Sequence, residues 1–244
     1  MSLAPMGYRG FIVYLSRCTT LLLLEPTQFN MTGLQTTVVG SFKKPDYLKI
    51  PCWVKSDGRE DCNFVDTFRI VQKEYGSEEL ERQVLRATKE TIELQEQLGY
   101  DVITDGEMRR DKYIYGFCRT LDGFDFENSE EKLCRNGAWV GRLPRVVSEV
   151  QVKEVQKGDT SPAKEWKIAQ SMATVPVKFT LPGPMTIADT VVNKYYESDR
   201  QLSGKMVSCI NKAVLDLVNN GCKYIQVCMA VDIKYSVRLR VEIR

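Results

Sequence analysis

The chain of 244 residues contains no histidine, and this absence narrows the chemistry open to it. Without an imidazole it can form no Ser-His or Cys-His nucleophile pair, no histidine general base and no zinc site that needs a histidine ligand. Any chemistry of this chain must therefore use carboxylates, thiols, cations or backbone groups.

The chain also lacks a C-x-x-C pair, a marked excess of one charge and a long apolar run. Its 8 cysteines are scattered, which in a chain of this length indicates reduced thiols and a cytoplasmic protein. Lys and Arg number 34 against 32 Asp and Glu, so we expect no nucleic-acid partner. No apolar run approaches the roughly 18 residues that span a bilayer, so we expect no membrane partner.

Residues 1–31 have the composition of a leader. Two apolar patches follow Arg9, a weak signal-peptide pattern that Arg17 interrupts. We predict that this segment lies outside the fold and that Met31 is the natural start. Export or organelle import is the alternative.

From Gln35 onward, strand and helix patterns alternate. The β-branched and apolar runs predict strands at 36–41, 101–104, 175–181 and 223–229. Apolar periodicity and capping residues predict helices at about 78–98, 162–172, 184–196 and 199–220. The stretch 120–160 shows no clear period and is predicted to be an irregular excursion or small subdomain. Nearly continuous apolar strands are typical of a parallel sheet with helices on both faces.

Polar or conformationally special residues follow each predicted strand: Gly40-Ser41, Asp105-Gly106-Glu107, Pro182-Gly183-Pro184 and Cys228. In barrels of alternating strands and helices, the working residues lie at the carboxyl ends of the strands. We therefore expect these residues to meet at one rim and to face a polar ligand. For any single position, a solvated loop residue is the competing interpretation.

Four stretches carry a family resemblance when they are taken together. They are "TTVVGSFKKPDYLKIP", "GYDVITDGEMRRDKY", "PVKFTLPGPMTIADT" and "GCKYIQV", which occur in this order between roughly residues 34 and 227. They resemble the C-terminal barrel of cobalamin-independent methionine synthase. The resemblance implies a (β/α)8 barrel that transfers a methyl group from a methylated folate to the sulfur of homocysteine, with a zinc ion on the substrate thiol.

The resemblance also implies roles for individual residues. The backbone at Val39, Gly40 and Ser41 would hold the substrate amino acid, and Glu107 would bind its ammonium group. The folate side would be formed by Gly183, Thr186 and Ile187, and Arg109 or Arg110 would meet an anionic group. The bland alternatives are turn glycines at 40 and 183 and a surface salt bridge between Glu107 and Arg110.

The chain departs from the family pattern after "YIQV". Asp-Glu-Pro is expected there, but the chain reads Cys228-Met229-Ala230. The zinc ligands of the family belong to later strands, so we predict no metal ligand and no catalytic residue. About four parallel strands with flanking helices over residues 32–230 make half of an eight-stranded barrel, which is a truncated TIM-type fold. Residues 231–244 alternate apolar and polar side chains, typical of a divergent strand or of an altered reading frame.

These observations predict a methyltransferase-family protein of methionine biosynthesis that is inactive as the isolated chain. Homocysteine and methyl-folate are the small-molecule partners implied by the resemblance, and zinc is implied only for the full-length family. Self-association could cover the exposed side of a half barrel. Alternatives are a non-catalytic amino-acid-binding or interaction module and a barrel of the uroporphyrinogen decarboxylase type, against which the D-G-E strand end argues.

Overall fold

The computed structural model describes residues 12–16, 34–50, 73, 78–134, 137, 139–153 and 161–228. Within these ranges, no helix combines the length and hydropathy of a membrane span. Residues Ile12–Ser16, inside the predicted leader, form strand β1. The rest of 1–31 and the whole tail 231–244 lie outside the described residues, so the predicted domain limits stay a prediction.

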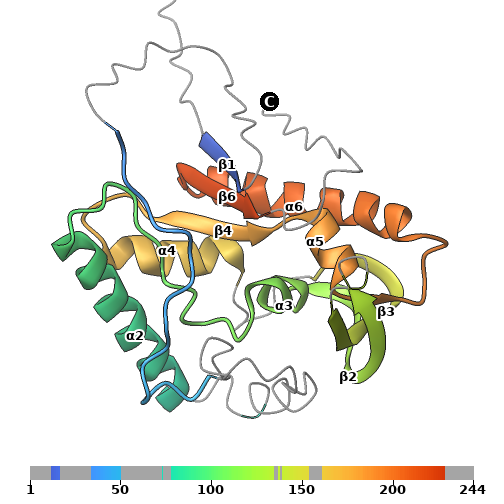
Figure 1. Cartoon of the computed structure of the whole chain (residues 1–244). Helices are drawn as coiled ribbons and strands as arrows, with labels where there is room; N and C mark the ends of the chain where they lie inside the picture. The colour runs from blue at the N-terminus through green and yellow to red at the C-terminus, as the bar shows by residue number, and fades with distance from the viewer. Residues whose placement is uncertain are drawn as a thin grey trace, which may run out of the picture.

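A parallel sheet joins segments that lie far apart in the sequence (Figure 1). Its strand order is β1–β6–β4, with β6 at Tyr224–Cys228 and β4 at Lys178–Pro182. Two isolated parallel bridges extend this array, from Val177 to Ile103 and from Val102 to Thr37. The segments predicted as strands therefore extend the sheet beyond β4: 101–104 lies next to the start of β4, and 36–41 lies next to 101–104. Each segment contributes only isolated bridge residues.

The described residues form the helices α2 (Glu78–Gln97), α3 (Tyr113–Cys118), α4 (Pro162–Met172), α5 (Pro184–Asp189) and α6 (Asp199–Asn219). Four of these five helices lie where the periodicity predicts them, with α5 shorter than predicted, and α3 was not predicted. The Ser161 hydroxyl accepts from the Lys164 amide at the start of α4, and the Ser198 hydroxyl does the same for Gln201 at α6. Helix α2 ends at Gln97 and is followed by Gly99, whose φ of 77° is the left-handed conformation that follows many helices.

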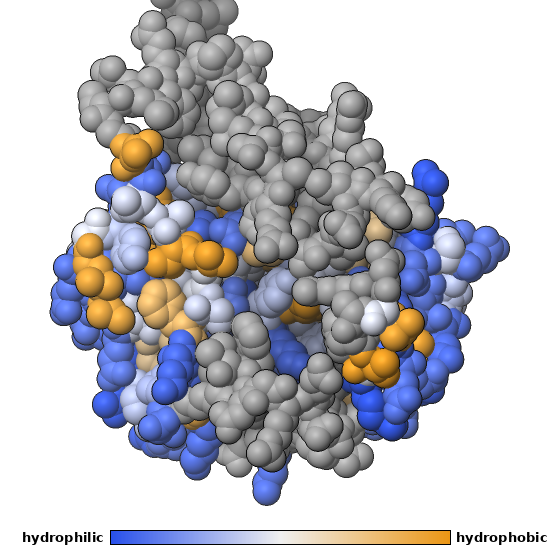
Figure 2. Space-filling model, viewed as in Figure 1, coloured by the Kyte–Doolittle hydropathy of each residue, from blue (hydrophilic) through white to orange (hydrophobic). Residues whose placement is uncertain are grey.

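The apolar face of the sheet packs against the helices. Phe179, Leu181 and Ile225 belong to one buried cluster with Met206 and Ile210 of α6. Complete burial of a leucine or isoleucine side chain contributes about 1.5–3 kcal/mol to folding, so this face supplies much of the driving force. On the molecular face seen in Figure 2, the apolar residues form several separate groups within a mostly hydrophilic surface.

The stretch 120–160, predicted to be an irregular excursion or small subdomain, contains a long β-hairpin over residues 121–152, so the predicted lack of regular structure is wrong there. Strands β2 (Leu121–Cys134) and β3 (Trp139–Val152) pair in antiparallel register, and the two-residue strand β5 (Val192–Asn193) adds to β3. The register shifts between Asp122 and Phe124 and again between Asp125 and Ser129. Such irregularities break the period-2 alternation by which a strand is recognised in sequence.

The architecture is thus α/β with one parallel sheet and one mixed sheet, in which β2 and β3 are antiparallel and β5 is parallel to β3. Nearly continuous apolar strands with helices on both faces were predicted, and this prediction is wrong for β4 and β6, since only one face of these strands is apolar. On the other face lie the polar residues Lys178 and Thr180 of β4 and Gln226 of β6, distributed from the start of β4 to the middle of the strands.

Candidate functional site

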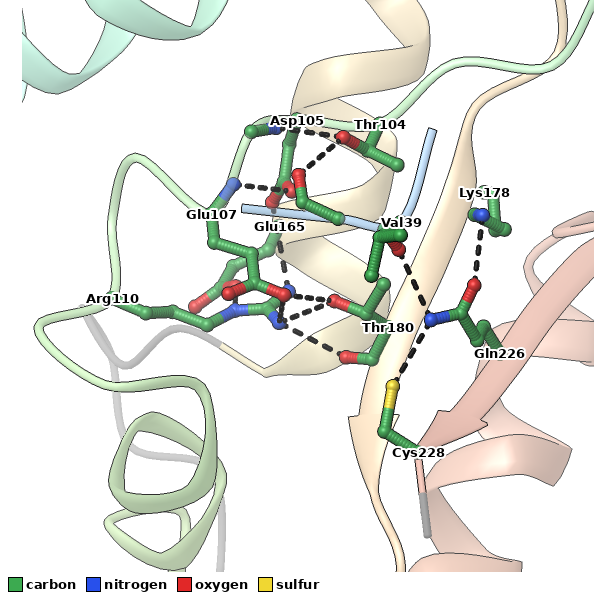
Figure 3. A network of polar contacts seen from close by, with 12 residues as sticks. Val39, Thr104, Asp105, Glu107, Arg110, Glu165, Lys178, Thr180, Gln226 and Cys228 are labelled. Atoms are coloured by element: carbon green, nitrogen blue, oxygen red, sulfur yellow. Dashed lines mark hydrogen bonds and ion pairs between the residues drawn. The ribbon is translucent and has the colours of Figure 1, made fainter. Parts of the chain in front are cut away.

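Alternate residues of β4 and β6 line one polar face of the sheet. Lys178 and Thr180 come from β4, and Gln226 and Cys228 from β6, with Thr180 directly opposite Gln226 in the register. Figure 3 shows Gln226 directed toward Val39, Thr180 directed toward Arg110 and Glu107, and Lys178 and Cys228 on either side of Gln226. Lys178, Thr180 and Gln226 are all buried, so their polar atoms require partners.

Glu107 lies at the centre of this face in an unusual backbone conformation. Its φ is 57°, a left-handed value that side-chain-bearing residues rarely adopt. Two contacts fix its peptide groups: its amide donates to Asp105 Oδ1 at 2.9 Å, and its carbonyl accepts from Lys44 Nζ at 3.3 Å. Its carboxylate accepts a hydrogen bond from the Thr180 hydroxyl at 2.7 Å.

Gly40 lies against the Glu107 carboxylate. A Cβ atom at position 40 would come within 3.0 Å of Glu107 Oε1 and 3.1 Å of Thr180 Cγ2. Glycine therefore permits the backbone of residues 38–41, here called the first segment, to approach the Glu107 carboxylate closely. Val39 and Ser41 on either side are exposed. The structure thus brings together the first two strand ends that were predicted to converge.

Arg110 is buried among three carboxylates. Its Nε lies 3.3 Å from Glu165 Oε2, its Nη2 lies 3.6 Å from Asp105 Oδ2 and its Nη1 lies 3.9 Å from Glu107 Oε1. Nη1 also donates to the hydroxyl of Thr180 at 3.0 Å. The salt bridge of Glu107 and Arg110 is therefore an interior contact and not a surface one.

The pKa values in this cluster reflect burial opposed by charge. Burial raises the pKa of Glu165, and the Arg110 guanidinium counteracts that rise. Burial disfavours the charge of Arg110, but the surrounding carboxylates outweigh it and raise its pKa. Arg109 points elsewhere, because both of its terminal nitrogens bond Glu81 of α2 at 2.6 and 2.7 Å. Both arginines predicted to bind an anion thus have carboxylate partners within the chain.

A second polar group ties the first segment to the sheet. Lys178 Nζ donates to the Val38 carbonyl at 2.6 Å and to Gln226 Oε1 at 2.8 Å. Gln226 Nε2 donates to the Val39 carbonyl at 3.0 Å, and the Thr104 hydroxyl donates to the Gly40 carbonyl at 2.8 Å. Burial lowers the pKa of Lys178 to about 8.

The predicted folate-side residues surround the end of β6. The Gly183 amide and the Thr186 hydroxyl both donate to the Cys228 carbonyl, at 2.8 and 3.2 Å. Ile187 is fully buried in the main apolar cluster, so any influence it has on a ligand must pass through packing.

The described ranges contain no group of three or more His, Cys, Asp or Glu residues that could hold a metal ion. Cys228 lies on the polar face, and Gln226 Nε2 donates to its sulfur at 3.0 Å. Burial raises the pKa of Cys228, which disfavours the thiolate that binds metals. These residues do not fit a zinc site.

The sequence predictions did not include Thr104, Glu165, Lys178, Thr180 and Gln226. A signal for two of them was present, since Lys178 and Gln226 interrupt otherwise apolar strands and polar residues in buried strands need a reason. Glu165 lies in the first turn of α4, where an acidic residue is ordinary, so its position in the sequence conveyed nothing of its contact with Arg110.

Comparison with known proteins identifies the relatives of this site. The family model described as cobalamin-independent synthase, catalytic domain, matches residues 62–232. Methionine synthase from Sulfolobus acidocaldarius is 30% identical over 199 residues, which cover 81% of this chain and 52% of that protein. Methionine synthase from Sulfurisphaera tokodaii is 32% identical over 195 residues, covering 80% of this chain and 51% of that protein.

A solved structure shows the same likeness. The B12-independent methionine synthase from Shewanella sp. W3-18-1, determined in complex with selenomethionine, superposes with a TM-score of 0.64 at 25% identity, covering 80% of this chain and 51% of that one. The chain spans about half the length of each of these relatives. Because the family model matches well over half of its residues, the chain belongs to the cobalamin-independent methionine synthase family.

Proposed function

We propose that the strand ends of this chain bind the amino-acid substrate of methionine synthesis and that its parallel segments are part of a (β/α)8 barrel. The observation that carries the proposal is the juxtaposition of the buried Glu107 carboxylate with Gly40 on the first segment. An α-amino acid presents an ammonium group next to a carboxylate. A side-chain carboxylate beside a stretch of backbone N–H groups is complementary to that pair.

Glu107 is suited to the ammonium group. Thr180 donates one hydrogen bond to its carboxylate, and an ionised carboxylate has acceptor capacity for several more. The Thr180 hydroxyl also accepts from Arg110, so a chain of contacts fixes where the carboxylate points. The backbone N–H groups of Val39, Gly40 and Ser41 are the matching donors for the ligand carboxylate.

The ligand class is supported by a relative. The Shewanella protein was solved in complex with selenomethionine, which has the same α-amino-acid head group as methionine and homocysteine. On this basis the reaction to which the chain relates is methyl transfer from a methylated folate to the homocysteine sulfur. Zinc, when bound in the family, would lower the pKa of the homocysteine thiol and so favour its thiolate form. Gly183 and Thr186 are proposed to face the folate, with Ile187 supporting them from the core.

We further propose that the isolated chain does not turn over and resides in the cytoplasm. The described residues offer no cluster of metal ligands, and the anion-binding role of Arg109 and Arg110 stays a prediction, as does self-association. Binding of an amino acid without turnover would favour the alternative function, a non-catalytic amino-acid-binding module on the same fold. Steady methionine production from methyl-folate and homocysteine in the presence of zinc would contradict inactivity.

Calorimetry with L-methionine and L-homocysteine tests the binding proposal. Glu107→Gln removes the charge with little change in shape and is expected to weaken both ligands by about tenfold or more. Glu165→Gln is the matched control, because it removes another carboxylate that contacts Arg110 and is expected to change affinity by less than about threefold. An absence of binding by the parent chain, or equal losses in the two variants, would refute the proposal.

A further inference from the structure

Three consecutive backbone carbonyls on the first segment are held by side chains from three different places in the sequence. Lys178 binds the carbonyl of Val38, Gln226 that of Val39 and Thr104 that of Gly40, at 2.6, 3.0 and 2.8 Å. Lys178 also binds Gln226 Oε1, which turns the amide nitrogen of Gln226 toward Val39 (Figure 3).

Between Thr36, which bonds Asp101, and Phe42, whose amide donates to the Gly106 carbonyl at 3.0 Å, these polar contacts and not apolar burial hold the backbone of residues 38–40. The side chains of Leu34 and Val39 are 89% and 78% exposed, and Thr37 makes only an isolated bridge to Val102. A ladder of backbone hydrogen bonds or a buried side chain would normally fix a strand. Here the described contacts between residues 38–40 and the sheet are chiefly those of the Lys178, Gln226 and Thr104 side chains, which donate to the backbone carbonyls of residues 38–40.

The direction of each carbonyl determines the direction of the next amide. The peptide bonds described here are all trans, and in a trans peptide the C=O of one residue and the N–H of the next point to opposite sides. A carbonyl of Val38 held toward Lys178 therefore turns the N–H of Val39 away from Lys178. The same relation sets the N–H groups of Gly40 and Ser41 through Gln226 and Thr104.

Burying the Lys178 side chain to hydrogen-bond two oxygen atoms costs free energy, because its ammonium group loses hydration. Lys178 is 1% exposed, and burial lowers its pKa to about 8, so its charged form is held against a desolvation cost. Apolar residues of similar volume often serve stability as well or better than buried charges. The geometry therefore points to a role for Lys178 in orientation more than in stability.

We propose that Lys178, Gln226 and Thr104 are positioning residues that aim the N–H groups of Val39, Gly40 and Ser41 at the carboxylate of the bound amino acid. This inference rests on the proposed function. It assigns to Lys178 and Gln226 an action on the ligand through the intervening backbone and not by contact with it.

The test compares two ligands across matched variants by calorimetry. L-methionine carries the carboxylate, and L-methioninol has a hydroxymethyl group in its place. Lys178→Met and Gln226→Leu are expected to weaken L-methionine by about tenfold, the loss that accompanies misdirected hydrogen bonds to a charged group. They are expected to change L-methioninol by less than about twofold, because that ligand does not depend on the aim of the amides.

Lys132→Met is the matched control. Lys132 Nζ also binds two backbone carbonyls, those of Ala188 and Val191 at 2.8 and 2.9 Å, and Asp199 at 3.3 Å, but it lies on the hairpin strand β2 and these contacts involve neither Glu107 nor residues 38–41. It is expected to leave L-methionine affinity within about twofold of the parent. If L-methioninol is too weak to measure, the ratio of L-methionine affinities between Lys178→Met and Lys132→Met decides.

Unchanged L-methionine affinity in Lys178→Met, or equal losses for both ligands, would overturn the inference while leaving the proposed function intact. Failure of the parent chain to bind L-methionine would instead refute the proposed function itself. Should Lys178→Met fail to fold by circular dichroism, Thr104→Val provides a second comparison, since it keeps the shape and removes the hydroxyl that donates to the Gly40 carbonyl at 2.8 Å and accepts from the Gly106 amide at 3.2 Å. Thr104→Val is then expected to weaken L-methionine selectively, and equal effects on the two ligands would overturn the inference.

Discussion

The two faces of the β4–β6 strand pair differ in chemistry, although alternate residues of the same strands build both. Phe179, Leu181 and Ile225 on one face are buried in the main apolar cluster, and Lys178 and Gln226 on the other are buried among polar partners. Burial of apolar area stabilises strongly, whereas a buried hydrogen bond contributes only about 1 kcal/mol net. The apolar face therefore contributes most to folding, and the polar face fixes the geometry of the candidate site.

The largest effect on stability is expected from removing the buried positive charge of Arg110. Arg110→Met leaves the carboxylates of Asp105, Glu107 and Glu165 without their cation, and it should lower the free energy of unfolding by about 3–5 kcal/mol at pH 7. Urea unfolding measures this loss. Arg82→Ala, which breaks an exposed pair on α2, is the control and should give no resolvable change.

The same variant has a pH signature. Burial already raises the pKa of Glu165, and loss of the guanidinium raises it further. The folded variant then binds a proton that the unfolded chain does not bind between the two pKa values, so its stability deficit shrinks as the pH falls from 7 to 5. A deficit below about 1 kcal/mol, or one that grows in acid, would show that the cluster is not held by charge.

On the apolar face, Leu181→Ala should lower the free energy of unfolding by about 3 kcal/mol. Leu181 is 1% exposed, and truncation both removes buried methyl groups and leaves a cavity. In the protein that remains folded, L-methionine affinity should stay within about twofold of the parent. Chemical unfolding and calorimetry on the same sample separate the two quantities, and a large loss of affinity would blur the distinction between the faces.

Lys178 provides a comparison across pH. Its pKa is about 8 in the folded state and about 10.4 for an unperturbed lysine, so between these values the unfolded chain binds more protons. The contribution of Lys178 to stability therefore rises with pH in this window. The stability of Lys178→Met relative to the parent should fall by about 2 kcal/mol between pH 7.5 and 10.5, measured by urea unfolding at both values. A pH-independent difference would contradict the lowered pKa.

The smallest of these effects concerns one hydroxyl. Thr180→Val keeps the shape but removes the group that donates to Glu107 and accepts from Arg110, and it should cost about 1 kcal/mol. Thr180→Ser keeps the hydroxyl and is the control. Thermal or urea unfolding of the two variants would reveal the difference, and equal stabilities would mean that the hydroxyl bridge contributes nothing.

Local signals predicted much of the fold. Helices α2, α4 and α6 begin and end within a few residues of their predicted limits, because serine caps, apolar periodicity and a terminal glycine are all properties of neighbouring residues. Helix α5 is shorter than predicted. It ends at Asp189, and the following Val192–Asn193 pair with β3, a partner that local periodicity does not reveal.

The site was predictable to a smaller extent. The convergence of Gly40 and Glu107 follows from the rule that parallel strand ends share an edge, which sequence alone supports. The contacts of Lys178 and Gln226 are made with backbone carbonyls of residues 38 and 39, and a carbonyl has no side-chain signature to read. Arg110 lies beside α4 because of the way the helices pack, which no short motif encodes.

At Glu107 the left-handed backbone favours a smaller residue, whereas the candidate site requires a carboxylate. Glycine at this position would relax the main chain by about 1 kcal/mol, and asparagine would also be better tolerated there than glutamate. Neither would present a carboxylate to Gly40. Selection of variants for thermal stability alone should therefore favour the smaller residues at position 107. Selection for ligand binding should retain glutamate. A difference between the two selections would show that Glu107 serves binding and not stability.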